Sequence, residues 1–211
     1  MRVRRSYRRP NKSQFVEMFG DTYSNSKNWT RKLLKDICTV RQGLQIPIAK
    51  RLTERDSKGD CFEYITVAYL HGTKQREYIK NPKQSVICTE EDILMTRTGN
   101  TGMVVSGVRG VFHNNFFLID YDKSLLNRTF MISYLNDPYV QSEIKRLAGT
   151  STIPDLNHGD FYKIGIYLPP LALQQEFAAF VEKVDKLAFA ARKRCDKAKQ
   201  LYKAKIQEYF G

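Results

Sequence analysis

The stretch PPLALQQEFAAFVEKVDKLAFAARKRCDKAKQLYKAKIQEYFG, residues 169–211, decides the fold of the C-terminal part of this chain. Pro169 and Pro170 end the preceding segment, and proline is well placed at the start of a helix because it loses no needed donor there. From Leu173 onward neither glycine nor proline occurs until Gly211. The sequence therefore predicts one uninterrupted helix over residues 171–209, which at 1.5 Å per residue would be about 60 Å long.

Apolar residues recur along this helix at alternating spacings of four and three, which is typical of the seam of a coiled coil. Two seam positions, Arg194 and Lys205, are charged, and the other eight are Leu173, Phe177, Phe180, Val184, Leu187, Ala191, Ala198 and Leu201. We expect residues 169–211 to form a dimerisation and docking helix, because such a stripe needs a partner. The alternative is that the domain folds back over the stripe, which could cover only its first turns.

The chain upstream of this helix predicts a mixed sheet with short helices. Short apolar runs punctuated by glycine are read as strands, at residues 62–70, 85–88, 93–97, 103–108, 111–119 and 162–168. Ser124 is expected to cap a helix over 125–135, and Asp137-Pro138 to open another over 139–147 that Gly149 ends. The fold class is thus α+β: a curved mixed β-sheet domain over residues 29–168, followed by one long C-terminal coiled-coil helix.

The two ends of the chain resemble each other. KSQFVEMFG, residues 12–20, aligns with KAKIQEYFG, residues 203–211, so that Phe15 matches Ile206, Glu17 matches Glu208 and Phe19 matches Phe210. The chain therefore begins and ends at equivalent points of a repeating unit of about 190 residues. Residues 1–28 are expected to hold a basic N-terminal segment and the end of this repeated helix.

The charge balance favours a polyanionic partner. Thirty-five Lys and Arg against twenty-two Asp and Glu give a formal net charge of +13, which suits a nucleic acid because each phosphate contact releases condensed counterions. The alternative is a merely soluble basic surface. No apolar run reaches the roughly 18 residues that a membrane span requires, and no secretory signal follows the start, so we expect a cytoplasmic location without membrane contact.

Residues for catalysis or metal binding are not evident in the sequence. Cys38, Cys61, Cys88 and Cys195 are far apart and form no CxxC pair, so we expect reduced, part-buried side chains and no metal. Asn136-Asp137-Pro138-Tyr139 superficially matches an amino-methyltransferase box, but no glycine-rich cofactor loop precedes it, and it is better explained as a helix boundary. We expect no catalytic residue and no cofactor.

Several motifs together resemble the specificity subunits of type I restriction–modification systems. FVEMFGD (15–21) followed by Trp29, Leu33 and Ile37 is similar to the family's join between the repeated helix and the recognition domain. DILMTRTG (92–99) resembles the family's strand and turn, and IPDL (153–156) with IGIYLPPL (164–171) resembles its domain exit. Gln174-Gln175-Glu176 stands where the family has Glu-Gln, which weakens any role given to that pair. The resemblance covers residues 12–211.

The resemblance implies a non-catalytic subunit that reads double-stranded DNA. Family members usually carry two target-recognition domains and two long helices, on which a methyltransferase (modification) subunit docks and with which a restriction/translocase subunit acts. This chain has one domain and one helix, so it looks like half a specificity subunit. Two copies pairing antiparallel would restore the two-domain form, and the resulting homodimer would read a split palindromic target.

DNA reading requires Arg, Lys, Asn and Gln on exposed loops. Three segments supply them, and the candidates are Arg41, Gln42, Gln45, Lys50, Arg51, Arg55 and Lys58, then Lys74, Gln75 and Arg76, then Arg97, Thr98, Asn100 and Thr101. Each could also be a solvated surface group, and Arg97 could instead brace its turn. Two other functions are carried as alternatives: a self-contained methyltransferase or nuclease fragment, and a free-standing DNA-binding regulator.

Overall fold

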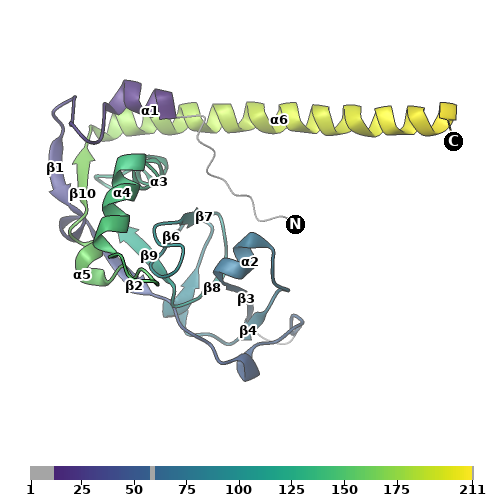
Figure 1. Ribbon diagram of the computed structural model, residues 1–211, viewed down its shortest axis with the longest axis horizontal. Coiled ribbons are helices and arrows are strands. Elements are labelled where there is room, and N and C mark those ends of the chain that lie inside the picture. Colours follow the sequence, from purple (N-terminus) through teal and green to yellow (C-terminus); the bar gives the residue numbers. More distant parts are fainter. Residues whose placement is uncertain (1–11, 58–59, 211) are drawn as a thin grey trace.

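The computed structural model describes residues 12–57 and 60–210, and it confirms the α+β class. A mixed α+β domain is followed by one long helix, α6 (Leu171–Phe210), which passes over the domain and continues well beyond it (Figure 1). The uninterrupted helix predicted over residues 171–209 is therefore present. Within the described residues no helix is both long and apolar enough to cross a membrane.

The strands form three small sheets. A two-stranded antiparallel sheet pairs β1 (Thr30–Leu33) with β10 (Gly165–Leu168) and so joins the two ends of the domain. The central sheet has the order β2-β9-β6-β7, with β2 (Cys38–Gln42), β9 (Phe116–Tyr121), β6 (Ile93–Thr96) and β7 (Val104–Ser106). The third has the order β4-β3-β8-β5, with β4 (Tyr78–Lys80), β3 (Cys61–Ile65), β8 (Gly110–Phe112) and β5 (Ile87–Cys88). Only β3 and β8 are parallel among these pairs, so the sheets are mixed as expected.

Two helices of the domain, α1 (Lys12–Phe19) and α3 (Arg128–Leu135), pack against α6. The others are α2 (Val67–His71), α4 (Pro138–Leu147) and α5 (His158–Phe161), with short 3-10 turns at η2 (Leu34–Asp36), η3 (Ile48–Lys50) and η4 (Gln84–Val86). Asp137 caps α4 through bonds from the amides of Tyr139 and Val140, as its sequence predicts. Figure 1 shows α1 and α3 beside the first turns of α6 and α2 on the far side of the domain.

Three local predictions were wrong, each for a local physical reason. Residues 62–70 do not form one strand, because the Thr66 side chain accepts a bond from the Tyr69 amide (3.0 Å) and starts α2, which Gly72 ends at φ +68°. Residues 111–119 form two strands, β8 and β9, separated by a turn at 113–115. Ser124 does not cap α3; Asn127 does, since its side chain accepts from the amides of Thr129 and Phe130.

Four aromatic rings anchor α6 to the domain. Phe15 and Phe19 of α1 lie 5.6 and 5.3 Å from the ring of Phe177, and 5.7 and 4.8 Å from the ring of Phe130 in α3. All four are almost completely buried. Such edge-to-face and stacked contacts add to the free energy of burying the rings.

Gln174 fixes the start of α6 by hydrogen bonds. It is fully buried; its Oε1 accepts from the Asn127 amide at 2.8 Å, and its Nε2 donates to the carbonyls of Leu125 (3.0 Å) and Pro169 (2.8 Å). The residue that departs from the family's usual Glu-Gln pair therefore has a definite structural role here. It ties α6 to the segment that leads into α3.

Candidate nucleic-acid interface

Four loops that are distant in sequence meet at one end of the domain. They are residues 42–46, 97–101, 113–115 and 151–156, and we call them together the loop end. Backbone bonds join them in turn: Gly43 and Leu44 donate to Phe116 and Phe112 (3.2 and 3.1 Å), Arg97 donates to Asn115 (2.8 Å), and Leu156 donates to Arg97 (2.9 Å). Two of the three segments predicted to read DNA are thus brought together by pairing that the sequence did not reveal.

Gly43 makes this close approach possible. A Cβ at this position would lie 2.2 Å from the Phe112 carbonyl oxygen and 2.4 Å from that of His113. Any side chain here would push the 42–46 loop away from the 113–115 turn. Glycine therefore sets the position of the loop that carries Leu44 and Gln45, both of which are exposed.

Arg97 braces the loop end. Its guanidinium forms an ion pair with Asp155 (2.7 Å), lies 5.6 Å from the centre of the Phe117 ring, and is only 17% exposed. Thr101 adds to the same junction, donating to the carbonyls of Arg97 (3.0 Å) and Pro154 (3.1 Å). The alternative that Arg97 holds the turn is the one its contacts favour, since its donors are engaged within the domain.

This contact gives a first testable prediction. We expect Arg97→Ala to lower the free energy of unfolding by about 1–3 kcal/mol, because the ion pair and the ring contact are both lost. Because Asp155 is 45% exposed, a double-mutant cycle with Asp155→Ala should assign only about 0.5–1 kcal/mol to the pair itself. Urea unfolding of the four proteins measures both quantities, and additive single effects would show that the pair is not coupled.

Arg51, also a predicted DNA-reading residue, is held within the fold. Its guanidinium donates twice to the Ile46 carbonyl (2.8 and 2.6 Å), pairs with Glu77 (3.2 Å) and lies over the Tyr64 ring. Lys74 pairs with the same Glu77 at 2.8 Å, and their proximity lowers the pKa of that carboxyl below its usual value despite partial burial. These contacts connect the remaining predicted segment, residues 74–76, to the loop end.

The other predicted residues divide into engaged and exposed groups. Arg76 pairs with Glu63 (2.5 Å), Arg41 donates to the Ser85 carbonyl (3.2 Å), and Gln42 donates to the Asn114 carbonyl (2.9 Å). Thr98 pairs through its backbone with Asp155, and Lys58 lies outside the described residues. The side chains that remain exposed, and that have no ion pair or strong hydrogen bond in the described part of the chain, are Gln45, Lys50, Arg55, Gln75 and Asn100.

The sequence interpretation missed two segments of the loop end. The 113–115 turn carries His113, Asn114 and Asn115, and was hidden because residues 111–119 were read as one strand. Asn114 Oδ1 is buried and has no hydrogen-bond partner among the described residues. The segment 151–153 was not among the candidates for DNA reading, and there Ile153 is 66% exposed. Asparagine amides read adenine edges, and exposed apolar side chains contact the thymine methyl group.

His113 contributes no positive charge at neutral pH. Burial lowers the pKa of its imidazole, and the nearby Arg51 guanidinium lowers it further. Its Nδ1 accepts a hydrogen bond from the Asn115 amide at 3.1 Å, which requires an unprotonated Nδ1. The ring therefore shapes the 113–115 turn and is not a phosphate-binding cation.

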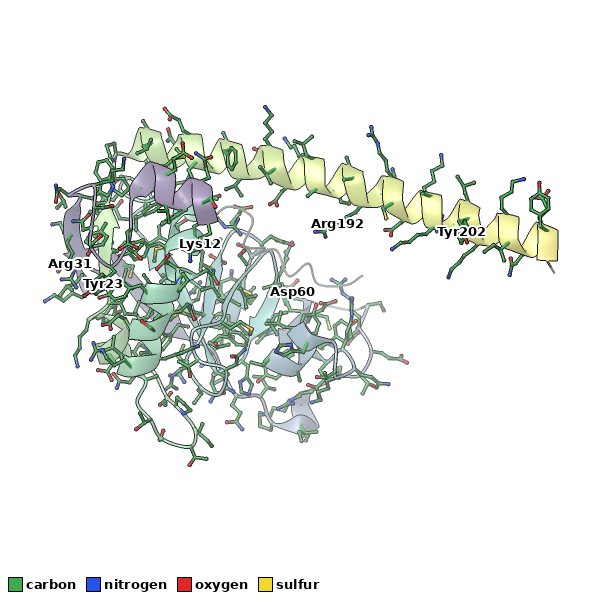
Figure 2. All side chains as sticks on the ribbon, turned by 45° about the horizontal axis from the view of Figure 1, so that its top comes forward. Lys12, Tyr23, Arg31, Asp60, Arg192 and Tyr202 are labelled. Atoms are coloured by element: carbon green, nitrogen blue, oxygen red, sulfur yellow. The ribbon has the colours of Figure 1, made fainter. Side chains whose placement is uncertain are left out.

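The residues predicted for dimerisation lie along α6 in two different environments. Phe177 is fully buried under α1, and Leu173 is half-buried against the same core. Farther along, Phe180, Leu187 and Leu201 are 38%, 63% and 60% exposed, and Val184, Ala191 and Ala198 lie on the same projecting stretch. Tyr202, also on this stretch, lies away from the domain (Figure 2). The domain thus covers only the first turns, as expected.

Three of the four cysteines are buried, and none is in a disulfide. Burial raises the pKa of Cys38 and of Cys88 to about 12, so these thiols stay protonated at neutral pH. Cys195, by contrast, is exposed on α6, whereas a part-buried position was expected.

Comparisons with known proteins agree on one family. Residues 26–199 match the family described as "Type I restriction modification DNA specificity domain". A type I restriction enzyme MjaVIII specificity subunit from Methanocaldococcus jannaschii is 23% identical over 152 residues, which cover 71% of this chain and 35% of that protein.

Solved structures share the fold. The crystal structure of an HsdS subunit from Thermoanaerobacter tengcongensis matches 87% of this chain and 44% of its own, with a TM-score of 0.60 and 18% identity. A chain from a structure titled for complex assembly and conformational transition of the type I R-M system matches 92% and 50%, with a TM-score of 0.58 and 15% identity. The chain thus spans about a third to a half of the length of these relatives.

Proposed function

We propose, from the premise that this chain belongs to the family of type I restriction–modification DNA specificity domains, that its loop end reads one half of a split DNA sequence. The family description is one of recognition and not of catalysis. The observation that carries the proposal is the loop end itself, where amide and apolar side chains of four loops are presented on one edge of the domain.

The loop end has the chemistry that base reading requires. Gln45, Asn100 and Asn115 offer amides for adenine, and Leu44 and Ile153, with Ile48 next to the 42–46 loop, offer apolar contacts for thymine. Lys50 and Arg55 are exposed cations in the segment that follows the 42–46 loop and suit phosphates or guanine. Arg41, Lys74, Gln75 and Arg76 are proposed as the flanks of this edge, and Gln42 and Thr98 as further contacts from its own loops. Arg51, Arg97 and the buried Thr101 are proposed as braces that position it.

We further propose that α6 is the assembly element and that two copies of the chain form a homodimer. In this scheme residues 29–168 are the target-recognition domain, residues 169–211 are the docking and dimerisation helix, and residues 1–28 complete the repeated helix. A modification (methyltransferase) subunit and a restriction/translocase subunit would bind this dimer in the prokaryotic cytoplasm. Two identical domains related by a two-fold axis would read an inverted repeat.

Selection from random double-stranded DNA tests this function. We expect the purified chain to enrich two inverted copies of one short sequence at a fixed spacing, with a solution mass near twice 24.6 kDa. Enrichment of a single short site would leave recognition intact but contradict the homodimer. No enrichment at all, or methyl transfer by the chain alone, would contradict the proposed recognition role.

A further inference from the structure

Helix α1 shows how a helix end with the repeated sequence packs against the start of α6. Figure 1 and Figure 2 show α1 alongside the first turns of α6 and running in the opposite direction. Phe15 and Phe19 are 4% and 5% exposed and flank Phe177, so Glu17, midway between them, is level with Phe177. The slot between Phe177 and Phe130 therefore accepts an antiparallel helix with apolar residues four positions apart.

The C-terminal end of α6 has the same sequence pattern, but no other element among residues 12–57 and 60–210 packs on it. Residues 203–210 align with α1, so that Ile206 is equivalent to Phe15 and Phe210 to Phe19. Ile206 is 42% exposed and Tyr209 is 71% exposed at the far end of the helix, where no other element lies near (Figure 1). Within one chain this end cannot reach the slot, because α6 is a continuous helix that leads away from it.

A second copy could place its helix end in the slot, and the equivalence fixes the register. If residues 203–210 replace residues 12–19, Glu208 of the second copy is level with Phe177. To within one residue, Val184 is then level with Tyr202 of the second copy, Ala188 with Ala198, and Ala191 with Cys195. Four of these six side chains are small, which permits close approach of the two helices at the centre, and the larger ones interlock at each end.

The flanking residues also suit this register. In an antiparallel pair, the residues that flank the contact line on one side of a helix meet the residues on the equivalent side of its partner helix. This brings Leu187 beside Leu201 of the second copy, and Asp185 beside Lys199 of the second copy. Both contacts occur twice because of the two-fold axis. At the two-fold axis, Arg192 lies near Arg192 of the second copy, and Arg194 lies near Arg194 of the second copy. Asp196, about one turn from them, offsets the repulsion between these like charges.

We propose that α1 and the C-terminal end of α6 from a second copy are alternative occupants of the slot between Phe130 and Phe177. Pairing of two chains in this register displaces α1 from each of them. The slot is then a site for a second copy of this chain, and α1 acts as an internal competitor that limits premature pairing. The inference rests on the proposed homodimer and adds to it a defined register and an exchange of helices.

Distance measurement between spin labels tests the exchange. A Lys183→Cys, Cys195→Ser protein carries one exposed thiol, because Cys38, Cys61 and Cys88 are buried. In the proposed register the two labels are separated by nineteen residues of helix, which gives a distance of about 30 Å when the spacing of the helices is included. If α1 stays in place, the helices must slide apart by about one heptad and the distance becomes about 40 Å.

Each outcome has a definite meaning. A distance of about 30 Å supports the exchange, while about 40 Å overturns it but leaves an antiparallel homodimer. Labels closer than about 20 Å indicate a parallel pair and also overturn the exchange. The absence of dipolar coupling shows a monomer and overturns the exchange together with the homodimer, whereas the DNA selection above would still report recognition by single domains.

Two substitutions give an independent test through the dimer dissociation constant. Phe15→Ala weakens the competitor, so we expect about tenfold tighter pairing; Ile206→Ala weakens the invading end, so we expect about tenfold weaker pairing. Gln200→Ala is the control, since Gln200 is exposed on the same helix but lies roughly 160° around it from Ala198 and Tyr202. A higher dimer dissociation constant for Phe15→Ala would contradict competition between α1 and the second copy, because α1 would then be stabilising the dimer.

Discussion

Replacing Lys50 and Arg55 by glutamate is expected to lower the affinity for the selected DNA about 100-fold, the largest change we expect from any pair of surface residues. Both side chains are exposed in the segment that follows the 42–46 loop, and neither has an ion pair within the described part of the chain. The substitution removes two cations and introduces two repulsive charges next to the phosphates. The slope of affinity against salt should become shallower by about two units on the logarithmic scale, since two fewer counterions are released.

A matched double variant separates a local contact from the overall charge. Lys35→Glu with Lys123→Glu makes the same change in net charge, but these residues flank the opposite end of the central sheet, where Cys38 pairs with Tyr121. Filter binding or fluorescence anisotropy at several salt concentrations measures all three proteins. If both double variants lose affinity equally, the effect is a property of net charge and the loop end is not the DNA-binding edge.

Phe177→Ala is expected to lower the free energy of unfolding by about 3–5 kcal/mol, the largest single effect on stability. Phe177 is fully buried and contacts the rings of Phe15 and Phe19, so alanine leaves a cavity where α1, α3 and α6 meet. The cavity has rigid walls, because Gln174, one turn earlier, is fixed by three hydrogen bonds and prevents α6 from moving inward.

Urea unfolding followed by circular dichroism measures this loss. Ile48→Ala is the control, because Ile48 is 77% exposed and its removal should change stability by no more than about 0.5 kcal/mol. A loss below about 1 kcal/mol for Phe177→Ala would show that the slot collapses readily or that α1 is weakly held. Together with the spin-label distances, the loss in the free energy of unfolding would show how strongly α1 is bound in the slot between Phe130 and Phe177.

The elements that are set by residues adjacent in sequence could be predicted from the sequence. Helix α6 follows from forty residues without glycine or proline, and α4 from Asp137-Pro138 at its start. The 62–70 run shows the limit of this reasoning. Its β-branched and aromatic residues favour a strand throughout, yet one cap at Thr66 and one left-handed glycine at Gly72 are enough to make half of it helical.

The loop end could be predicted only in part, because its assembly depends on contacts between residues far apart in sequence. The exposed cations and amides of residues 45–55 and 100 could be listed from their chemistry. That Arg97 is engaged by Asp155, and Arg51 by Ile46 and Glu77, depends on contacts that appear only when the loops meet. The 113–115 asparagines were missed because alternation of apolar residues does not reveal a three-residue turn between two buried strands.

The loops of this edge are held to one another largely through main-chain atoms. The bonds from Gly43, Leu44, Arg97 and Leu156 all end on carbonyl oxygens, so they do not depend on which side chains the exposed positions carry. In the proposed function, substitution at Gln45, Lys50, Arg55, Asn100 or Ile153 would therefore change the preferred DNA sequence while the scaffold keeps its shape. The residues that hold the fold would thus be separate from the residues that set the DNA target. A new target could then evolve by substitution without loss of the folded state.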